Sequence, residues 1–223
     1  MSKKKYRILN LYACLGGNRK EWDKVTDIEV TAVELDSELA KMYKQRFPND
    51  NVIVADAHQY LLDNYKDFDF IWASPPCPTH SRMKLNQAKG SGNHKPVFPD
   101  MKLYEEIIFL KHYFNGKWCV ENVIPYYEPL IPAKKRGRHL YWTNFNLPND
   151  LKGEVPKSSW NQPGLGILER YHGIEDLMKN YKAEKRKDSM INNLVDYKAG
   201  RTILETALGI DNRESIKQLY MFP

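Results

Sequence analysis

The sequence is poor in cysteine and has no long apolar run. Its 223 residues include only three cysteines, too few and too scattered for a disulfide framework or a zinc site. This cysteine usage indicates a reducing, intracellular setting. No apolar segment approaches the length of a membrane span, and residues 1–6 lack the apolar stretch of a signal peptide. We therefore expect a cytoplasmic protein with no metal site and no membrane partner.

Charge of one sign does not dominate either. The formal net charge is +6 and 28% of the residues are charged, which permits nucleic acid as a partner without requiring it. The hydrophobic fraction of 42% is ordinary, and the length suits one domain with a sizeable core, alone or with a small appendage. Composition therefore indicates a soluble globular protein.

The first motif along the chain is a predicted strand that runs into a glycine turn. Residues 6–12 form the strand, and the segment after it contains the adjacent pair Gly16 and Gly17. A strand, a glycine turn and a helix start form the nucleotide-binding opening of a doubly wound fold, where glycines let a ligand approach the backbone closely. A single Gly-Gly pair is more often a plain turn, so this motif alone decides nothing.

Two further predicted strands each end on an acidic residue. Residues 28–34 end on Glu34 before a predicted helix over 37–47, and residues 51–55 are followed by Asp56. An acid about 20 residues past the glycine turn is placed to accept hydrogen bonds from ribose hydroxyls. The alternative is an acid that stabilises the positive end of a helix. Two such acids beside a glycine turn favour a nucleoside site.

A proline-rich loop around Cys77 follows the fourth predicted strand. The strand covers residues 68–72, and residues 73–81 read Ala-Ser-Pro-Pro-Cys-Pro-Thr-His-Ser. Proline locks φ and removes an N–H donor, so Cys77 lies on a rigid loop at the carboxyl end of a strand, where open α/β sheets place reactive groups. The alternative is a turn that holds a buried, unreactive thiol.

The polar stretch after this loop shows little periodicity. It spans residues 82–95 and includes Arg82 and Lys84, and we expect it to close over a polyanionic substrate. An ordinary surface loop is the alternative, although long loops in compact domains are usually functional or disordered. A helix then begins near Asp100, and its predicted buried face consists of Leu103, Ile107, Ile108 and Leu110.

A fifth predicted strand, residues 116–123, carries Glu121 to the same edge of the sheet as Cys77. No histidine is placed to act as a base, which argues against a protease arrangement. A thiol beside a carboxylate suits instead the addition of a thiolate to an electron-poor ring that the carboxylic acid protonates or hydrogen-bonds. Basic residues 134–139 then precede a strand-like segment, 140–142, and we expect at least one arginine among them to point into the site.

These motifs, in this order, resemble those of the DNA (cytosine-5-)methyltransferase family. The proline-framed Cys77 followed by Glu121-Asn122-Val123 is the most specific part, whereas the glycine and arginine matches are individually weak. The resemblance is good over residues 6–142 and loose over 190–208. The other matching segments are residues 12–17 for the cofactor-binding motif, Glu34 and Asp56 for its acids, residues 136–138 for Arg-x-Arg, and residues 193–195 for the last motif.

The resemblance implies a fold and a cofactor. The fold is a Rossmann-like, doubly wound, mostly parallel α/β sheet of the class I S-adenosylmethionine-dependent methyltransferases, with a reduced target-recognition segment. The cofactor is S-adenosyl-L-methionine, and its product is S-adenosyl-L-homocysteine. The residues implied to bind it are Tyr12, Cys14, Leu15, Gly16, Gly17, Glu34, Leu35, Asp56, Ala57, Pro76, Asn193 and Val195.

The resemblance also implies the reaction, which is methyl transfer to carbon 5 of cytosine in double-stranded DNA. The base is flipped out of the duplex, and Cys77 as thiolate adds to its carbon 6. Glu121 engages ring N3 and the exocyclic amine. Arg138 hydrogen-bonds the base and supports Glu121, with Arg136 nearby in a similar role. The implied substrate-binding residues are Ser81, Arg82, Lys84 and Asn122.

The sequence also departs from the family. Cys14 stands where a glycine is usual, and Lys134 where a glutamine is usual. Residues 143–192 are too few for the usual target-recognition region, so the chain resembles compact phage, mobile-element or restriction-modification enzymes of bacterial or phage-infected cells, and a protein partner is one source of specificity. We expect a catalytic and cofactor-binding domain, 1–142, a reduced target-recognition segment, 143–190, and a C-terminal helical segment, 191–223, that packs back on the catalytic domain.

Three alternatives stay open. An amino-directed DNA methyltransferase shares the fold and a Ser-Pro-Pro loop, but its next residue is an aromatic where this chain has Cys77. A tRNA cytosine-5 methyltransferase of the same family keeps the same cysteine and glutamate chemistry. The third is a catalytically silent DNA-binding relic, against which the retention of Cys77, Glu121 and Arg138 argues.

Overall fold

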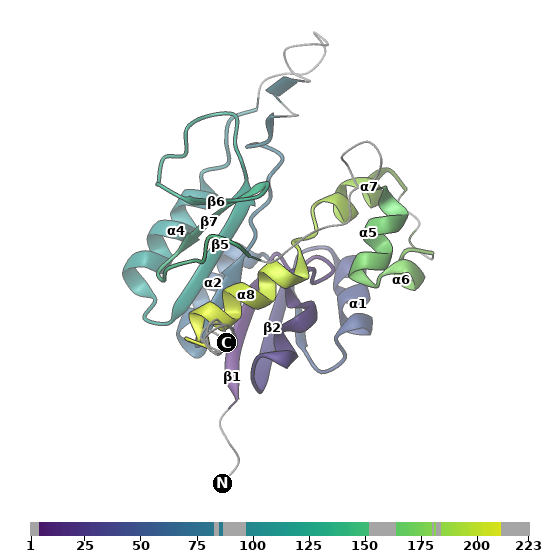
Figure 1. Ribbon diagram of the computed structural model, residues 1–223, viewed down its shortest axis with the longest axis horizontal. Coiled ribbons are helices and arrows are strands. Elements are labelled where there is room, and N and C mark those ends of the chain that lie inside the picture. Colours follow the sequence, from purple (N-terminus) through teal and green to yellow (C-terminus); the bar gives the residue numbers. More distant parts are fainter. Residues whose placement is uncertain are drawn as a thin grey trace, which may run out of the picture.

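The fold is built on one central β-sheet (Figure 1). The structure is a computed structural model, and it describes residues 5–82, 85–86, 97–151, 164–179, 181 and 184–210. The strands within these residues are β1 (Tyr6–Leu11), β2 (Ile28–Glu34), β3 (Asn51–Val54), β4 (Phe70–Ala73), β5 (Lys117–Val123), β6 (Lys134–Arg136) and β7 (His139–Thr143). Their order across the sheet is β3-β2-β1-β4-β5-β7-β6.

The first five strands are parallel to one another. β7 runs antiparallel to β5, and β6 runs antiparallel to β7. The mostly parallel, doubly wound sheet that the sequence predicts is therefore confirmed. β1 lies between β2 and β4, so the strand order reverses at this point. Open α/β sheets bind their ligands outside the carboxyl ends of the strands at such a reversal.

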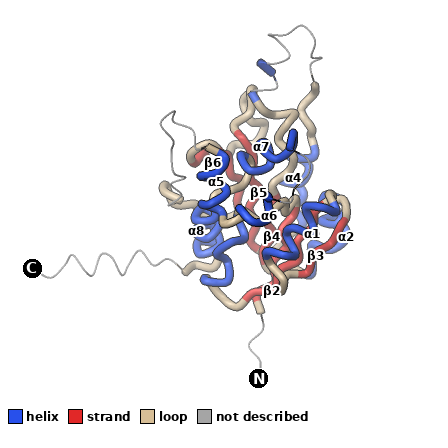
Figure 2. The backbone as a smooth tube through the Cα atoms, turned by 90° about the vertical axis from the view of Figure 1, so that its right-hand side faces the viewer, coloured by secondary structure: helices blue, strands red, loops and turns tan. Residues whose placement is uncertain are grey.

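Helices cover both faces of the sheet (Figures 1 and 2). They are η1 (Asn18–Lys24), α1 (Ser37–Arg46), α2 (Ala57–Asn64), η2 (Tyr65–Asp67), α4 (Lys102–Tyr113), α5 (Leu165–His172), α6 (Glu175–Lys179), α7 (Glu184–Asn192) and α8 (Tyr197–Ala207). α2 and α4 pack on one face, and η1, α1 and α8 pack on the other. No helix within the described residues is long and apolar enough to cross a membrane.

The face under α2 and α4 holds one of the two main apolar cores. From α4, Leu103, Ile107 and Leu110 pack against strands of the sheet. The sequence also predicts Ile108 on this buried face, and that prediction is wrong, because its side chain is half exposed. An α-helix turns about 100° per residue, so position 108 lies roughly 140° around the axis from position 103 and faces solvent.

On the other face, α8 packs closely against η1. Gly200 makes this approach possible, since a Cβ at its position would lie 2.2 Å from the carbonyl oxygen of Asn18. The indole N–H of Trp22 donates to the carbonyl of Gly200 over 3.2 Å, and Trp22 itself packs on Trp72 with ring centroids 6.0 Å apart. The end of the described chain is thereby fixed against the residues that follow β1.

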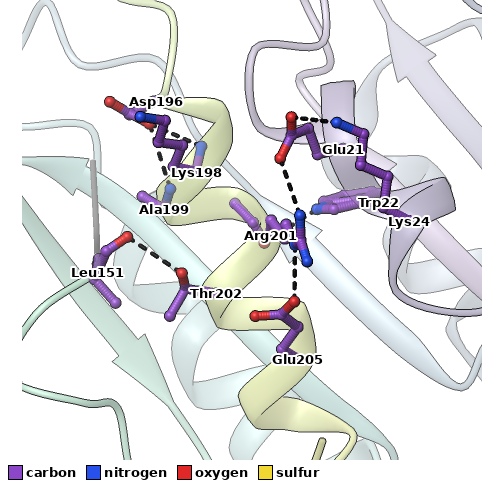
Figure 3. Close-up of polar contacts among 11 residues, drawn as sticks. Glu21, Trp22, Lys24, Leu151, Asp196, Lys198, Ala199, Arg201, Thr202 and Glu205 are labelled. Carbon is purple, nitrogen blue, oxygen red and sulfur yellow. Dashed lines mark hydrogen bonds and ion pairs between the residues drawn. The ribbon is translucent and has the colours of Figure 1, made fainter. Parts of the chain in front are cut away.

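Polar contacts position α8 around this packing (Figure 3). The carboxylate of Asp196 accepts hydrogen bonds from the backbone N–H groups of Lys198 and Ala199 and so caps the helix. Arg201 reaches Glu21 of η1 at 3.5 Å. Exposed pairs of this kind contribute little to stability, so the apolar contact and the glycine dominate.

The short helices α5, α6 and α7 lie beside α1 (Figure 1) and share an apolar cluster with it. Leu15 of the glycine turn and Met42 of α1 pack against side chains from all three helices. The guanidinium of Arg46 donates to the carbonyl oxygens of Leu15 and His172, both at 2.5 Å. The helices α5, α6 and α7 therefore cover the outer side of the glycine turn.

We predict that Gly200→Ala lowers the free energy of unfolding by roughly 1–3 kcal/mol, because the new methyl group overpacks the contact with Asn18. Gly166→Ala is the matched control, since Gly166 lies on α5 and a Cβ there meets nothing within 4 Å. That control is expected to be neutral or to stabilise by about 0.4–1 kcal/mol. Urea denaturation followed by tryptophan fluorescence measures both, and equal stability of the two variants would contradict the close approach.

Candidate active site

Two loops flank the reversal of strand order. The glycine turn follows β1, and the loop that carries Cys77 follows β4. Both loops leave the carboxyl ends of adjacent parallel strands, because β1 pairs with β4 in parallel register. The structure thus brings the two most informative sequence motifs to one edge of the sheet.

The glycine turn has an unusual backbone. φ is positive at Tyr12 (57°), Cys14 (46°) and Gly16 (64°). The left-handed conformation costs a non-glycine residue about 1–2 kcal/mol. The family that the motifs resemble usually has a glycine at position 14, and a glycine would adopt this backbone without strain. This chain has a cysteine there instead. Burial raises the pKa of the Cys14 thiol to about 12, so this cysteine is neutral.

The last predicted motif returns to this turn. A Cβ on Gly17 would lie 2.6 Å from the carbonyl oxygen of Val195 and 3.2 Å from the Cβ of Leu194. Val195 is buried, and Asn193 is exposed at the end of α7. The structure therefore brings residues 193–195 against the first motif, although more than half of the chain separates them.

The two acids differ in what they do. The carboxylate of Glu34 accepts hydrogen bonds from the backbone N–H groups of Cys14 (2.8 Å) and Asp36 (3.0 Å), so it holds the glycine turn to the end of β2. Asp56 caps α2, and the hydrogen bond from the backbone N–H of Gln59 holds the pKa of its carboxyl below the usual value. Both carboxylates lie at the carboxyl edge of the sheet.

Apolar side chains also remain uncovered at this edge. Leu35 follows β2 and is 70% exposed, and Val54 at the end of β3 is 56% exposed. Ala57 is buried in the first turn of α2. An exposed leucine next to acids and a glycine turn is the composition expected of a surface that receives a nucleoside.

The loop around Cys77 is held by backbone contacts. The side-chain amide of Asn122 on β5 donates to the carbonyl of Pro75 over 2.9 Å. The carbonyl of Cys77 accepts from the backbone N–H groups of His80 (3.0 Å) and Ser81 (3.1 Å). Asn122 is only 1% exposed. The structure therefore gives Asn122 a loop-positioning contact, and its assignment to substrate binding stays a prediction.

The other predicted substrate residues lie just beyond this loop. Ser81 forms an isolated β-bridge with Pro125, and the guanidinium of Arg82 donates to the carbonyl of Pro125 over 3.2 Å. Pro76 is exposed beside Cys77. Lys84 and most of the polar stretch 82–95 lie outside the described residues. The loop after β5 is therefore the support against which the Cys77 loop packs.

His80 is a site residue that sequence reasoning missed. Its side chain is 1% exposed, and its Nδ1 lies 2.5 Å from the hydroxyl of Tyr127 on the loop after β5. Burial lowers the pKa of His80, which favours the neutral imidazole. A polar aromatic residue three positions after the cysteine was the available signal, but its partner lies 47 positions away in the sequence.

The thiol of Cys77 and the carboxylate of Glu121 interact electrostatically. Burial first, and then the negative charge of Glu121, raise the pKa of the half-buried Cys77 thiol. Glu121 lies on β5 and is 6% exposed. The Nε2 of His139 is 3.6 Å from its Oε1, so an imidazole is the nearest ion-pair partner of this carboxylate. Near neutral pH the site holds a protonated thiol beside a carboxyl group.

The two arginines of the Arg-x-Arg segment do not meet Glu121. Arg136 donates to the carbonyl oxygens of Pro148 (2.6 Å) and Leu147 (3.4 Å), and Arg138 donates to the carbonyl of Asn192 (3.3 Å). Among the described residues, His139 takes the place beside Glu121. The reason is the hairpin register, because His139 pairs with Val123 and Arg138 falls in the turn before β7. The expectation of an arginine at the carboxylate stays a prediction, and the described contacts of both arginines lie elsewhere.

No metal-binding arrangement stands out. Across the ranges that the structure describes, no three His, Cys, Asp or Glu side chains are grouped so that they could hold a metal ion.

A solved structure with a similar fold indicates the fold class of the chain. The solved methyltransferase EhMeth of Entamoeba histolytica is 11% identical, with a TM-score of 0.53 over 93% of this chain and 99% of that one. At this identity the likeness shows the fold, and the chain has the α/β fold of the methyltransferases. No curated protein matches the chain.

A family model matches part of the sequence. Residues 6–108, somewhat less than half of the chain, match the model of the C-5 cytosine-specific DNA methylases. The match confirms the resemblance that the motifs predict. A crystal structure of DNMT2 from Spodoptera frugiperda is 26% identical, with a TM-score of 0.39 over 53% of this chain. The chain spans 36% of the length of that DNMT2.

We predict that Glu121→Gln makes Cys77 more reactive toward iodoacetamide at pH 8. Removing the negative charge lowers the pKa of the thiol, so a larger fraction is thiolate, although burial still keeps the pKa above its usual value. Alkylation of the Cys77 peptide, followed by mass spectrometry between pH 7 and 10, measures the shift.

Glu128→Gln is the control for this experiment, because Glu128 is an exposed acid on the loop after β5. Its alkylation profile is expected to match that of the wild type. Identical profiles for Glu121→Gln and Glu128→Gln would contradict the coupling between Glu121 and the thiol.

Proposed function

We propose that the chain transfers a methyl group from S-adenosylmethionine to carbon 5 of cytosine in double-stranded DNA. The observation that carries the proposal is that the Cys77 loop follows β4 and that Glu121 lies near the carboxyl end of the adjacent parallel strand β5, beside the glycine turn. The family match over residues 6–108 supports the same chemistry. A thiol and a carboxyl group are the two functions that addition to a pyrimidine ring needs.

The residues around the glycine turn fit the proposed cofactor. Leu35 is 70% exposed and offers an apolar surface for an adenine ring, and Glu34 and Asp56 offer acceptors for hydroxyl and amino groups. Tyr12, Cys14, Leu15, Gly16, Gly17, Ala57, Pro76, Asn193 and Val195 are the further residues that we propose to line this site. When bound, S-adenosylmethionine supplies an electrophilic methyl group.

The proposed chemistry begins at the sulfur of Cys77. The thiol loses its proton to solvent, the thiolate forms a bond to carbon 6 of the flipped cytosine, and the electrons of the carbon 5–carbon 6 double bond become available at carbon 5. Glu121 hydrogen-bonds ring N3 and the exocyclic amine and stabilises the ring as its electron density rises. After methyl transfer, carbon 5 loses its proton to solvent and the sulfur of Cys77 leaves.

We add His139 to the proposed site and place the two arginines at the edge of that site. At 3.6 Å from Glu121, His139 is placed to hold the carboxyl group in orientation toward a base. Arg138 is exposed and reaches the end of α7, so we propose that it contacts the nucleic acid rather than Glu121. Ser81, Arg82 and Lys84 remain proposed contacts to the DNA strand, since they follow the catalytic loop.

The domain division also remains a proposal. Residues 143–190 are proposed as a reduced target-recognition segment, yet α5 to α7 pack on α1 and the glycine turn, where they support cofactor binding. A compact enzyme of the phage or restriction-modification kind, acting in the cytoplasm, fits this small segment. Specificity would then come from the loop after Cys77, from Arg138, or from a protein partner.

We predict that Cys77→Ala abolishes methyl transfer to DNA while binding of S-adenosylhomocysteine persists. Without the sulfur, no adduct forms at carbon 6 and carbon 5 is not activated. Transfer of a radiolabelled methyl group measures activity, with duplex DNA and tRNA as parallel substrates, and calorimetry measures binding. Bisulfite sequencing of the DNA product identifies 5-methylcytosine and its sequence context.

Cys119→Ala is the matched control, because Cys119 is a fully buried cysteine on β5 and is expected to leave methyl transfer intact. Methylation of carbon 5 by the Cys77→Ala protein would refute the covalent mechanism. Methylation of tRNA with no activity on duplex DNA would move the proposal to an RNA substrate.

We predict that Leu35→Ala weakens binding of S-adenosylhomocysteine about fivefold. A leucine side chain that a ligand partly covers contributes roughly 1 kcal/mol of apolar contact to binding. Ile108→Ala is the control, since it also removes an exposed aliphatic side chain but from the middle of α4. Both variants are expected to unfold within about 0.5 kcal/mol of the wild type. Equal Kd values for the two variants would place the adenosine elsewhere.

A further inference from the structure

A buried carboxyl group lies beneath the edge where the cofactor is proposed to bind. Glu106 on α4 is fully buried. Its Oε1 accepts a hydrogen bond from the hydroxyl of Tyr12, and the Nδ1 of His58 lies 3.0 Å from the same oxygen. Its Oε2 is buried and has no hydrogen-bond partner. Neither His58 nor Glu106 belongs to the sequence motifs.

A buried carboxyl group with one unpaired oxygen is unfavourable for the stability of the fold. A buried acid is expensive to desolvate, and burial raises the pKa of Glu106. Its neighbours on α4, Leu103 and Ile107, belong to the apolar core, and an aliphatic residue at position 106 would continue that surface. A half-satisfied carboxyl group in such a position calls for an explanation other than packing.

The contacts of Glu106 join the segments that form the cofactor edge. Tyr12 is the first residue of the glycine turn and has a left-handed backbone, with φ of 57°, which is strained for a tyrosine. His58 lies in the first turn of α2, two residues after Asp56. One carboxyl group therefore ties the glycine turn, the start of α2 and α4 together.

The charges around this cluster come from the same three elements. His58 Nε2 faces Glu105 at 3.8 Å, and Lys102 approaches Asp56 at 3.9 Å. The acids Asp56 and Asp100 also act on Tyr12, whose pKa is raised mainly by burial and by Glu106. The hydroxyl of Tyr12 therefore stays protonated and remains a donor to Glu106.

We propose that Glu106 is a positioning residue for the adenosyl cofactor: its carboxyl group holds the Tyr12 ring and the start of α2 in the geometry that the ligand requires. Glu106 acts through Tyr12 and His58 and does not itself touch the ligand, since it is buried. The proposal rests on the proposed function, because it assumes that the glycine turn binds S-adenosylmethionine or its product.

If Glu106 positions the ligand site, its replacement should change ligand affinity and protein stability differently. Replacing a purely structural residue would change both together. In Tyr12→Phe/Glu106→Leu the buried hydroxyl and the carboxyl group are both replaced by apolar groups, and His58, which is not fully buried, keeps Glu105 at 3.8 Å. The unfolding free energy should therefore be retained or increased. Affinity for S-adenosylhomocysteine should nevertheless fall about tenfold, because the Tyr12 ring and α2 lose their shared anchor. Glu106→Gln keeps the acceptor oxygen and the side-chain length, and it should restore most of the affinity lost in Glu106→Leu.

The test measures Kd for S-adenosylhomocysteine by calorimetry and stability by urea denaturation. The proteins are the wild type, Tyr12→Phe, Glu106→Leu, Glu106→Gln, the double variant, and Glu105→Gln as the exposed control on the same helix. Tyr12→Phe removes the hydrogen bond without altering α4, so the test holds even if Glu106→Leu does not fold. The effects of Tyr12→Phe and Glu106→Leu on affinity should be strongly non-additive, because they remove one interaction.

Each outcome bears on the proposal. Loss of affinity with retained stability, in Tyr12→Phe and the double variant but not in Glu105→Gln, supports it. Wild-type affinity in Tyr12→Phe, or parallel losses of affinity and stability, would overturn it while leaving the methyltransferase proposal intact. Absence of binding to the wild-type protein would overturn the proposed function and this inference together.

Discussion

The close approach of two backbone segments at Gly17 and Gly200 is the constraint on which the rest of the structure depends. A side chain on Gly17 would collide with Val195, and one on Gly200 would collide with Asn18. The absence of both side chains lets residues 193–207 lie directly on the segment that follows β1. The glycine turn is therefore closed from behind by the far end of the described chain, and Tyr12, Cys14 and Gly16 keep their left-handed backbones inside that support.

The loop of Cys77 is also held by contacts with other parts of the chain, but here prolines and hydrogen bonds hold it. Prolines limit its backbone, and Asn122 and the Pro125 segment hold it from the neighbouring strand. Both loops are irregular segments fixed by distant parts of the chain, which is how a rigid site is built on loops. The sheet contributes the meeting point, because β1 and β4 are adjacent at the reversal of strand order.

The sequence predicts the first five strands and the main motifs well, because buried parallel strands are short apolar runs and their ends carry the polar residues. It does not predict the cluster of Tyr12, His58 and Glu106, whose members lie 94 and 48 positions apart in their two contacts. Nor does it predict the contact between Glu121 and His139. The antiparallel register of β5 and β7 decides which residues lie near Glu121, and a local pattern of basic residues carries no register.

The proposed reaction suggests a function for the electrostatic interaction between Cys77 and Glu121. Burial first, and then the negative charge of Glu121, raise the pKa of the thiol and keep the sulfur protonated. When the carboxyl group shares a proton with ring N3 of a bound base, that charge is reduced and the pKa of Cys77 falls. In the proposed reaction, a larger fraction of the nucleophile would then be thiolate when a pyrimidine occupies the site. A free thiolate would be exposed to oxidation, so such a coupling would protect the cysteine between turnovers.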